Sequence, residues 1–249
     1  MLQLYKIEPM DKLKNLNKLS VFILAGGFGT RLQDVVKEVP KPMAPILNKP
    51  FLEYQINEIR KYYPKSNIYL LTHYMSEVIE NYFKNDELIT IIKEETPLGT
   101  GGSIKNAIKE LGLDVNDSLL VFNGDTYIKP DLKDMVTSTK IDISILASYQ
   151  NNCDRYGTLT IKDNFITEFN EKQIGIKDSY INAGCYYFKN LDFFNQIKDC
   201  KFAIEDKFKE YLLSSKIGIF KYNSVFIDIG IPEDYKKMIN YMKEYDNGN

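Results

Sequence analysis

Short apolar runs alternate with amphipathic stretches through the first part of the chain. Apolar runs of strand length occur at residues 21–24, 67–72, 88–92, 119–122 and 141–148. Stretches with apolar residues three or four positions apart lie between them, at 50–64, 76–83, 104–111 and 131–137. This alternation is typical of right-handed βαβ units. It therefore predicts an α/β fold with a mixed, mostly parallel sheet flanked by helices.

The pattern changes near residue 150, where the predicted strands become short and hairpin-like. They cover 156–161, 165–170 and 182–188, and Asp163-Asn164 forms the first turn. A helix at 204–213, strands near 217–221 and 225–227, and a helix that begins at Pro232 complete the chain. We expect one domain over 19–249, whose part 151–249 adds a small β-rich subregion to the sheet begun by 19–150. The polar residues 1–18 predict an N-terminal extension, either an edge strand or an oligomer contact.

Composition narrows the possible partners and sites. The 249 residues carry a net charge of −2, so we expect no broad basic surface and no nucleic-acid partner. The three cysteines show neither a disulfide framework nor metal-ligand spacing, which suits a reducing cytoplasm. His73 is the only histidine in the sequence, and we expect it to be packed or hydrogen-bonded locally. No apolar run reaches membrane length, so we expect a cytoplasmic protein with no membrane partner.

A glycine-rich loop follows the first predicted strand. Gly26, Gly27 and Gly29 allow a ligand to approach the backbone closely, and Arg31 adds a permanently charged fork. Lys41 lies between two prolines, which stiffen its backbone. The loop fits neither the Walker A spacing nor G-x-G-x-x-G, and a plain glycine turn is the alternative. Together, the loop and the two cations predict a cradle for a polyphosphate.

A second glycine-rich segment precedes the helix that contains Ile104. Gly99, Gly101 and Gly102 lie beside the start of this helix, where backbone N–H groups favour anions and hydrogen-bond acceptors. The alternative is a flexible loop between a strand and a helix.

Two aspartates follow predicted strands. Asp125 ends the segment Asn123-Gly124-Asp125, where the carboxyl end of a parallel strand commonly borders a ligand. Asp228 precedes a glycine turn and the last helix. Taken alone, the first residue could form an Asx turn and the second a helix cap.

The motif GG-x-GTRL and the downstream PKPM resemble the sugar-1-phosphate nucleotidyltransferases, and the resemblance covers roughly residues 19–242. It implies the Rossmann-like nucleotide-diphospho-sugar transferase fold, with 19–150 as the nucleotide-binding half and 151–249 as the sugar-binding half. The resemblance implies that a nucleoside triphosphate is bound by Leu24, Ala25, Gly26, Gly27, Gly29, Thr30, Arg31, Lys41, Glu94, Glu95, Gly99, Thr100, Gly101 and Asn123.

Three shorter segments resemble the family's sugar 1-phosphate site. They supply Gly157, the pair Glu171-Lys172, and Asn182-Ala183-Gly184. The resemblance implies that Asp125 and Asp228 hold Mg²⁺. It also implies catalytic roles for Arg31, Lys41, Asp125, Lys172 and Asp228.

The segments VPKPMAPI and PLGTGG most resemble guanylyltransferases for D-glycero-D-manno-heptose 1-phosphate. That branch implies GTP as the donor, GDP-heptose and pyrophosphate as products, and a role in bacterial capsule, lipopolysaccharide or S-layer synthesis. In that branch Glu94 or Glu95 could accept from the amine and imine of guanine. Mannose 1-phosphate with GTP, or a UTP-dependent uridylyltransferase, remains an alternative. Family members are commonly dimers or tetramers.

Two other classes remain open. A catalytically silent sugar-nucleotide sensor would be expected to lack a phosphate-binding cation or a metal-binding aspartate, and this chain has both. A GT-A glycosyltransferase would call for a D-x-D motif, which Asn123-Gly124-Asp125 does not supply.

Overall fold

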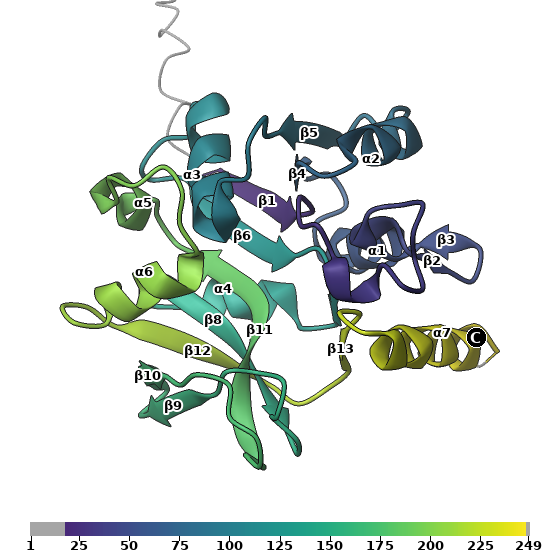
Figure 1. Ribbon diagram of the computed structural model, residues 1–249. Helices are drawn as coiled ribbons and strands as arrows, with labels where there is room; N and C mark the ends of the chain where they lie inside the picture. The colour runs from purple at the N-terminus through teal and green to yellow at the C-terminus, as the bar shows by residue number, and fades with distance from the viewer. Residues whose placement is uncertain (1–17, 248–249) are drawn as a thin grey trace, which may run out of the picture.

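The computed structural model describes residues 18–247, and its largest sheet has nine strands in the order β5-β4-β1-β6-β11-β8-β12-β10-β9 (Figure 1). Strands β10 and β11 run opposite to the other seven, which confirms a mixed, mostly parallel sheet. Both halves of the chain contribute strands to it. In chain order the strands are β1 Leu19–Leu24, β4 Ile68–Thr72, β5 Ile89–Lys93, β6 Ser118–Asn123, β8 Ile143–Gln150, β9 Leu159–Lys162, β10 Phe165–Phe169, β11 Ser179–Phe188 and β12 Ile217–Tyr222.

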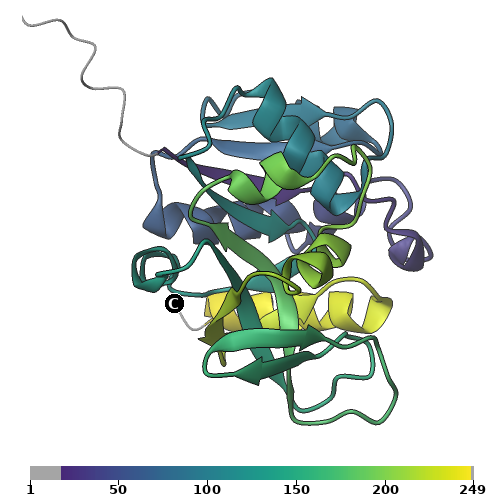
Figure 2. The ribbon, with the colours of Figure 1, turned by 90° about the vertical axis from the view of Figure 1, so that its left-hand side faces the viewer.

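Helices cover both faces of this sheet (Figures 1 and 2). On one face, apolar side chains pack from α1 Phe51–Tyr62, α2 Ser76–Phe83 and α4 Leu132–Ser138. On the other face, they come from α3 Gly99–Glu110, α5 Asp192–Gln196 and α6 Ile204–Tyr211. The predicted helical period produces this packing: α1, for example, buries Leu52, Ile56 and Ile59.

The register of the parallel strands brings their carboxyl ends together. Strand β1 lies between β4 and β6, and its last residue, Leu24, pairs with Leu71 on one side and Asn123 on the other. The loops that leave these strands therefore start from neighbouring points, where open α/β sheets commonly bind ligands.

Two small antiparallel pairs complete this end of the molecule. Strand β7 Thr126–Ile128 pairs with β13 Phe226–Asp228, and β2 Pro45–Ile46 pairs with β3 Lys49–Pro50. Helix α7 Pro232–Asn247 packs beside them through a third apolar cluster, which includes Tyr127, Ile227 and Met238. The sequence pattern missed α5, β2, β3 and β7, because such short elements show no measurable period.

Other details confirm or correct the sequence predictions. Asp163 and Asn164 both adopt positive φ between β9 and β10, as predicted for a hairpin turn. Helix α3 begins at Gly99, inside the segment predicted to be a loop. Residues 1–17 of the predicted extension lie outside the part of the chain described here. Within residues 18–247, no helix has the length and apolar character needed to span a membrane.

Candidate active site

A cavity of about 290 Å³ opens at the carboxyl ends of β1, β4 and β6. Many of the residues predicted to bind a nucleotide line it. They are Leu24, Gly26, Gly27, Gly29, Lys41, Glu94, Gly99, Thr100 and Asn123, and Asp125 joins them. The sequence motifs, although far apart along the chain, therefore meet around one space.

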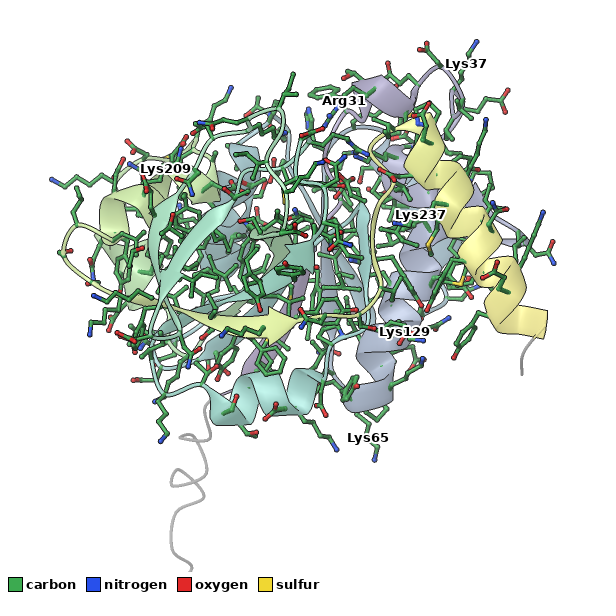
Figure 3. The ribbon with its side chains drawn as sticks, turned by 90° about the horizontal axis from the view of Figure 1, so that it is seen from below. Arg31, Lys37, Lys65, Lys129, Lys209 and Lys237 are labelled. Atoms are coloured by element: carbon green, nitrogen blue, oxygen red, sulfur yellow. The ribbon has the colours of Figure 1, made fainter. Side chains whose placement is uncertain are left out.

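The glycine loop needs its glycines for steric reasons. Gly29 has a φ of 60°, and a Cβ there would lie 2.7 Å from Cβ of Lys41. A Cβ at Gly27 would meet no atom of residues 18–247 within 4 Å, so this backbone faces open space in the described part of the chain. Thr30 and Arg31 lie next to them on the 3₁₀ turn η2 Thr30–Leu32, exposed and outside the cavity lining (Figure 3). The loop thus presents its backbone to the cavity, and Arg31 remains free to reach a ligand outside it.

Glu94 and Glu95 differ sharply in environment. Glu94 is buried in the cavity wall, where its Oε2 accepts from the Leu98 N–H at 3.2 Å. Among the described residues 18–247, its other oxygen, Oε1, has no hydrogen-bond partner, and the same is true of the buried Oδ1 of Asn123. Glu95 is exposed and does not line the cavity. Buried polar atoms without partners are uncommon, so these two oxygens point to a partner that the described residues do not supply.

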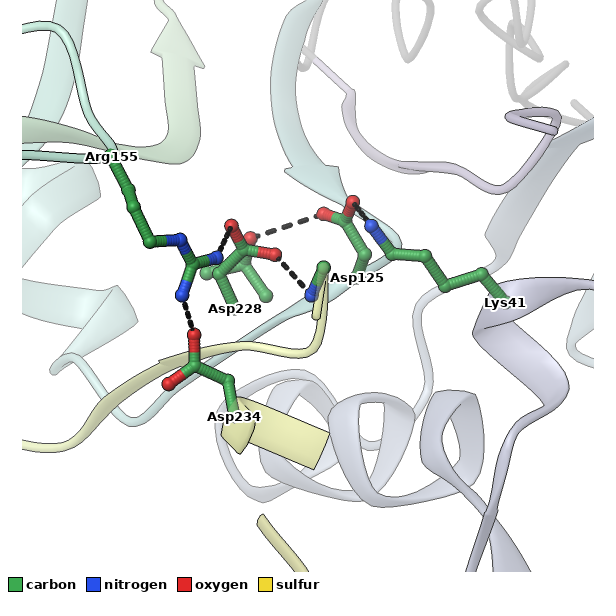
Figure 4. A network of polar contacts seen from close by, with 7 residues as sticks. Lys41, Asp125, Arg155, Asp228 and Asp234 are labelled. Carbon is green, nitrogen blue, oxygen red and sulfur yellow. Dashed lines mark hydrogen bonds and ion pairs between the residues drawn. The ribbon is translucent and has the colours of Figure 1, made fainter. Parts of the chain in front are cut away.

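Strand pairing brings Asp125 and Asp228 together. In the β7–β13 ladder, Asp228 lies opposite Thr126, the neighbour of Asp125. Two cations hold the carboxylates (Figure 4): Lys41 Nζ lies 2.6 Å from Asp125 Oδ2, and Arg155 lies 3.6 Å from Asp228 Oδ2. Burial raises the pKa of Asp228, and the nearby Asp125 raises it further, whereas Lys41 and Arg155 oppose both effects. The two aspartates thus form one electrostatic unit.

The predicted sugar-binding segments lie in different surroundings. Asn182 and Gly184 are on β11, where a Cβ at Gly184 would come within 2.4 Å of the Asn123 amide. Ala183, between them, is buried. A Cβ at Gly157 would lie 2.7 Å from the Asn170 carbonyl, so a side chain there would force two backbone segments apart. The Asn182 segment therefore adjoins the nucleotide cavity.

Other predicted residues also lie outside the cavity lining, among them the fully buried Ala25. Glu171 and Lys172 are exposed in the loop between β10 and β11, and Glu171 pairs with Lys209 of α6. Figure 3 shows Lys209 well separated from Arg31. Gly101 is buried, and its N–H donates to the Phe202 carbonyl at 3.0 Å. The start of α3 therefore binds a segment of this chain, which corrects the expectation of open N–H groups there.

The sequence and the fold are similar to those of other proteins. The sequence profile of a family described as Nucleotidyl transferase matches residues 20–244, which is most of the chain. The chain belongs to this nucleotidyl transferase family. A protein of Campylobacter jejuni named D-glycero-alpha-D-manno-heptose 1-phosphate guanylyltransferase is 38% identical over 222 residues, which cover 87% of this chain and 97% of that protein. A protein of the same name from Aneurinibacillus thermoaerophilus is 37% identical over 235 residues, which cover 91% and 100%.

A solved structure is also similar to this nucleotidyl transferase. HddC from Yersinia pseudotuberculosis, complexed with GMP-PN, aligns with a TM-score of 0.77 and 33% identity. The alignment covers 90% of this chain and 99% of HddC.

The aspartate pair of this nucleotidyl transferase has the chemistry of a site for a hard divalent cation. Both aspartates offer carboxylate oxygens, which Mg²⁺ prefers. Residues 18–247 contain no group of three or more His, Cys, Asp or Glu side chains that could enclose a metal. Two carboxylates fit an ion that takes its remaining ligands from substrate oxygens and water.

The structure adds residues that the motifs did not single out as binding residues. Phe28, Pro97 and Ser103 line the cavity, as does His73, whose Nδ1 lies 2.9 Å from the Glu94 carbonyl. The local hydrogen bond of His73 was predicted, but its place in the cavity wall was not. The position of Phe28 inside the glycine motif was a signal available from the sequence. Pro97 likewise lies inside the PLGTGG segment, whereas His73 gave no such signal, because only the fold turns it toward the cavity.

Proposed function

We propose that this nucleotidyl transferase transfers GMP from GTP to D-glycero-α-D-manno-heptose 1-phosphate, giving GDP-heptose and pyrophosphate for bacterial surface glycans. Two relatives carry that activity as their names and cover nearly their whole lengths in the alignments. A structural neighbour was solved with the guanine nucleotide GMP-PN. Family membership supports the reaction class, and these relatives favour the base and the sugar.

The observation that supports the choice of base is that Glu94 lies in the cavity wall and that its buried Oε1 has no hydrogen-bond partner among residues 18–247. Guanine presents two adjacent donors, the N1–H and the 2-amino group, whereas no other common base offers this pair. A carboxylate that faces the cavity with Oε1 unpartnered can accept from both. Glu94, rather than the exposed Glu95, is therefore the proposed guanine acceptor.

The residues around the cavity would then serve an in-line displacement. An oxygen of the sugar 1-phosphate attacks the α-phosphorus of GTP, the bond to the bridging oxygen breaks, and pyrophosphate leaves with the electron pair. The glycine loop, Arg31 and Lys41 bind the triphosphate, and Lys172 binds the sugar phosphate from its exposed loop. The attacking phosphate is largely deprotonated at neutral pH and needs no general base. Catalysis is then mainly positioning and electrostatic stabilisation.

A divalent cation, which we propose to be Mg²⁺, would be held by Asp125 and Asp228. When bound, it would supply positive charge beside the reacting phosphates. Asn182 and Gly157 would border the sugar, with Glu171 reaching its hydroxyls from the same exposed loop as Lys172.

Substitution of the two adjacent glutamates tests the proposed base. Glu94→Gln replaces one acceptor oxygen by a donor, so kcat/KM with GTP should fall by about 10- to 100-fold, as expected for a hydrogen bond to a charged group. Glu95→Gln is the matched control and should retain most of the activity. The measurement is pyrophosphate release with GTP, UTP, ATP and CTP. A larger loss in the Glu95 variant would contradict the assignment.

A further inference from the structure

A series of hydrogen bonds runs through the protein from the nucleotide cavity to the sugar-binding segment. Thr100 lines the cavity on the first turn of α3, and its Oγ1 lies 3.3 Å from Glu205 Oε2 on α6. The other oxygen of Glu205 accepts from the Tyr186 hydroxyl at 3.2 Å. The Tyr186 oxygen in turn accepts from the Asn182 side-chain amide at 3.0 Å. These bonds join the two halves of the chain.

The backbone fixes the direction of the bonds at the Asn182 end. The Gly184 N–H can only donate, so the Asn182 atom that faces it at 2.9 Å is Oδ1. The amide nitrogen of Asn182 then faces Tyr186 and donates to it. Because the Tyr186 oxygen accepts this bond, its own hydrogen is available for Glu205.

The backbone also fixes the direction at the Thr100 end. The Ile204 N–H donates to Thr100 Oγ1 at 2.9 Å, which leaves the hydroxyl hydrogen for Glu205. Both hydroxyls therefore donate to one carboxyl group, the Thr100 hydroxyl to Oε2 and the Tyr186 hydroxyl to Oε1 of Glu205.

Packing holds the centre of this network in place. Tyr186 is fully buried, and its ring lies 5.4 Å from that of Phe208 on α6. Burial raises the pKa of Tyr186 well above its usual range, so the hydroxyl remains a donor at neutral pH. Figure 1 shows α6 next to both α3 and β11.

We propose that Tyr186 and Glu205 are positioning residues that hold the Asn182 amide in one orientation for the sugar 1-phosphate. The inference rests on the proposed function, in which Asn182 binds the sugar. Gly184 and Tyr186 use one acceptor position and one N–H of the amide, so a second N–H and a second lone pair remain for sugar hydroxyls. Since Glu205 also binds Thr100, the amide is held in a fixed position relative to the nucleotide cavity.

Tyr186→Phe removes only the hydroxyl and tests this inference directly. The KM for the sugar 1-phosphate should rise about tenfold, because the amide loses the bond that orients it. The KM for GTP should stay within about twofold, since Glu205 still holds Thr100. Tyr187→Phe is the matched control, because Tyr187 is the next residue on β11 and its side chain packs into the cluster on the other face of the sheet.

Glu205→Gln provides a second variant of unchanged size. It replaces one acceptor oxygen by an N–H group, so one of the two hydroxyls loses its acceptor, and the KM for the sugar 1-phosphate should again rise. An unchanged KM in both variants would overturn the inference. An equal rise in the KM values of both substrates, accompanied by a lower Tm, would show a purely structural role and would also overturn it.

Wild-type turnover separates this inference from the proposed function. If the wild-type protein releases no pyrophosphate with any sugar 1-phosphate, the proposed function fails and the inference fails with it. If the wild-type protein turns over but both variants match it, only the inference fails.

Discussion

Lys41 Nζ lies 2.6 Å from Asp125 Oδ2, so a residue predicted to bind phosphate holds a residue predicted to bind metal. The Lys41 side chain is only 11% exposed, and the Asp125 side chain is 34% exposed. The lysine therefore neutralises part of the charge of the aspartate pair.

Lys41→Met should make the folded protein depend more on a divalent cation. Without the lysine, Asp125 and Asp228 repel each other, opposed mainly by Arg155. We expect a lower Tm in the absence of Mg²⁺ and a larger rise in Tm on adding MgCl₂ than the wild-type protein shows. Thermal denaturation with and without MgCl₂, in the absence of nucleotide, measures this difference. Equal shifts in the two proteins would count against a shared role for Lys41 and the cation.

Gln55 supports the backbone on both sides of Asp125. Its buried Nε2 donates to the Asn123 carbonyl at 2.7 Å and to the Thr126 carbonyl at 3.0 Å. Gln55→Leu leaves both carbonyls without this donor, which should lower the free energy of unfolding by about 1–3 kcal/mol. We also expect a lower kcat, because Asp125 is less firmly placed. Urea denaturation together with steady-state kinetics checks both effects, and unchanged values of both would rule out this supporting role.

Two glycines should separate an effect on stability from an effect on activity. A Cβ at Gly101 would lie 2.1 Å from the Phe202 ring, so Gly101→Ala should lower Tm by disturbing the contact between α3 and the segment before α6. A Cβ at Gly27, a residue of the cavity lining, would meet no atom within 4 Å in the part of the chain that the structure describes. Gly27→Ala should therefore keep its Tm and lose activity. The reverse result in thermal denaturation and pyrophosphate-release assays would contradict the placement of these glycines.

Arg60 and Asp86 form a two-bond ion pair between α1 and the segment before β5, at 2.8 and 2.7 Å. The hydrogen bonds from Arg60 lower the pKa of Asp86. A carboxyl whose folded-state pKa is lowered stabilises the protein above its unfolded pKa of about 3.9, and this stabilisation is lost as the pH falls through the folded value.

Asp86→Asn should accordingly reduce the free energy of unfolding at pH 7 by about 1 kcal/mol. The difference from the wild-type protein should shrink as the pH falls below 4. Urea denaturation across this pH range gives the comparison. If the difference in the free energy of unfolding between the two proteins grew toward low pH, the result would contradict stabilisation by this ion pair.

The sequence predicted the sheet because strands and helices leave local signals, whereas phosphate binding by Arg31 and Lys41 stays a prediction. Strand-length apolar runs and helical periods specify which faces are buried, as on α1. The glycine loop can be recognised from consecutive residues alone, because its motif does not depend on contacts with distant parts of the chain. The pairing of Asp125 with Asp228 could be expected only from the family resemblance. It depends on the ladder between β7 and β13, and β7 is too short to show a pattern of its own.

Other features depend on contacts that no local pattern encodes. Gly101 and Gly102 look like an open ligand loop in the sequence, yet Phe202 accepts from both of their N–H groups. Glu94 is buried and Glu95 is exposed because of where each residue lies after β5 ends. Both are glutamates, so the residue type does not distinguish them. The hydrogen-bond network through Tyr186 and Glu205 joins residues from three elements, so it could not be predicted from the spacing of residues along the sequence.

The most direct test of the proposed function is pyrophosphate release by the wild-type protein with Mg²⁺, in which each of the four common NTPs is combined with heptose, mannose and glucose 1-phosphates. We predict release with GTP and D-glycero-α-D-manno-heptose 1-phosphate far above every other pair. Preferential release with another pair would keep the reaction class and overturn the proposed substrates. Nucleotide binding without release from any pair would contradict the catalytic account.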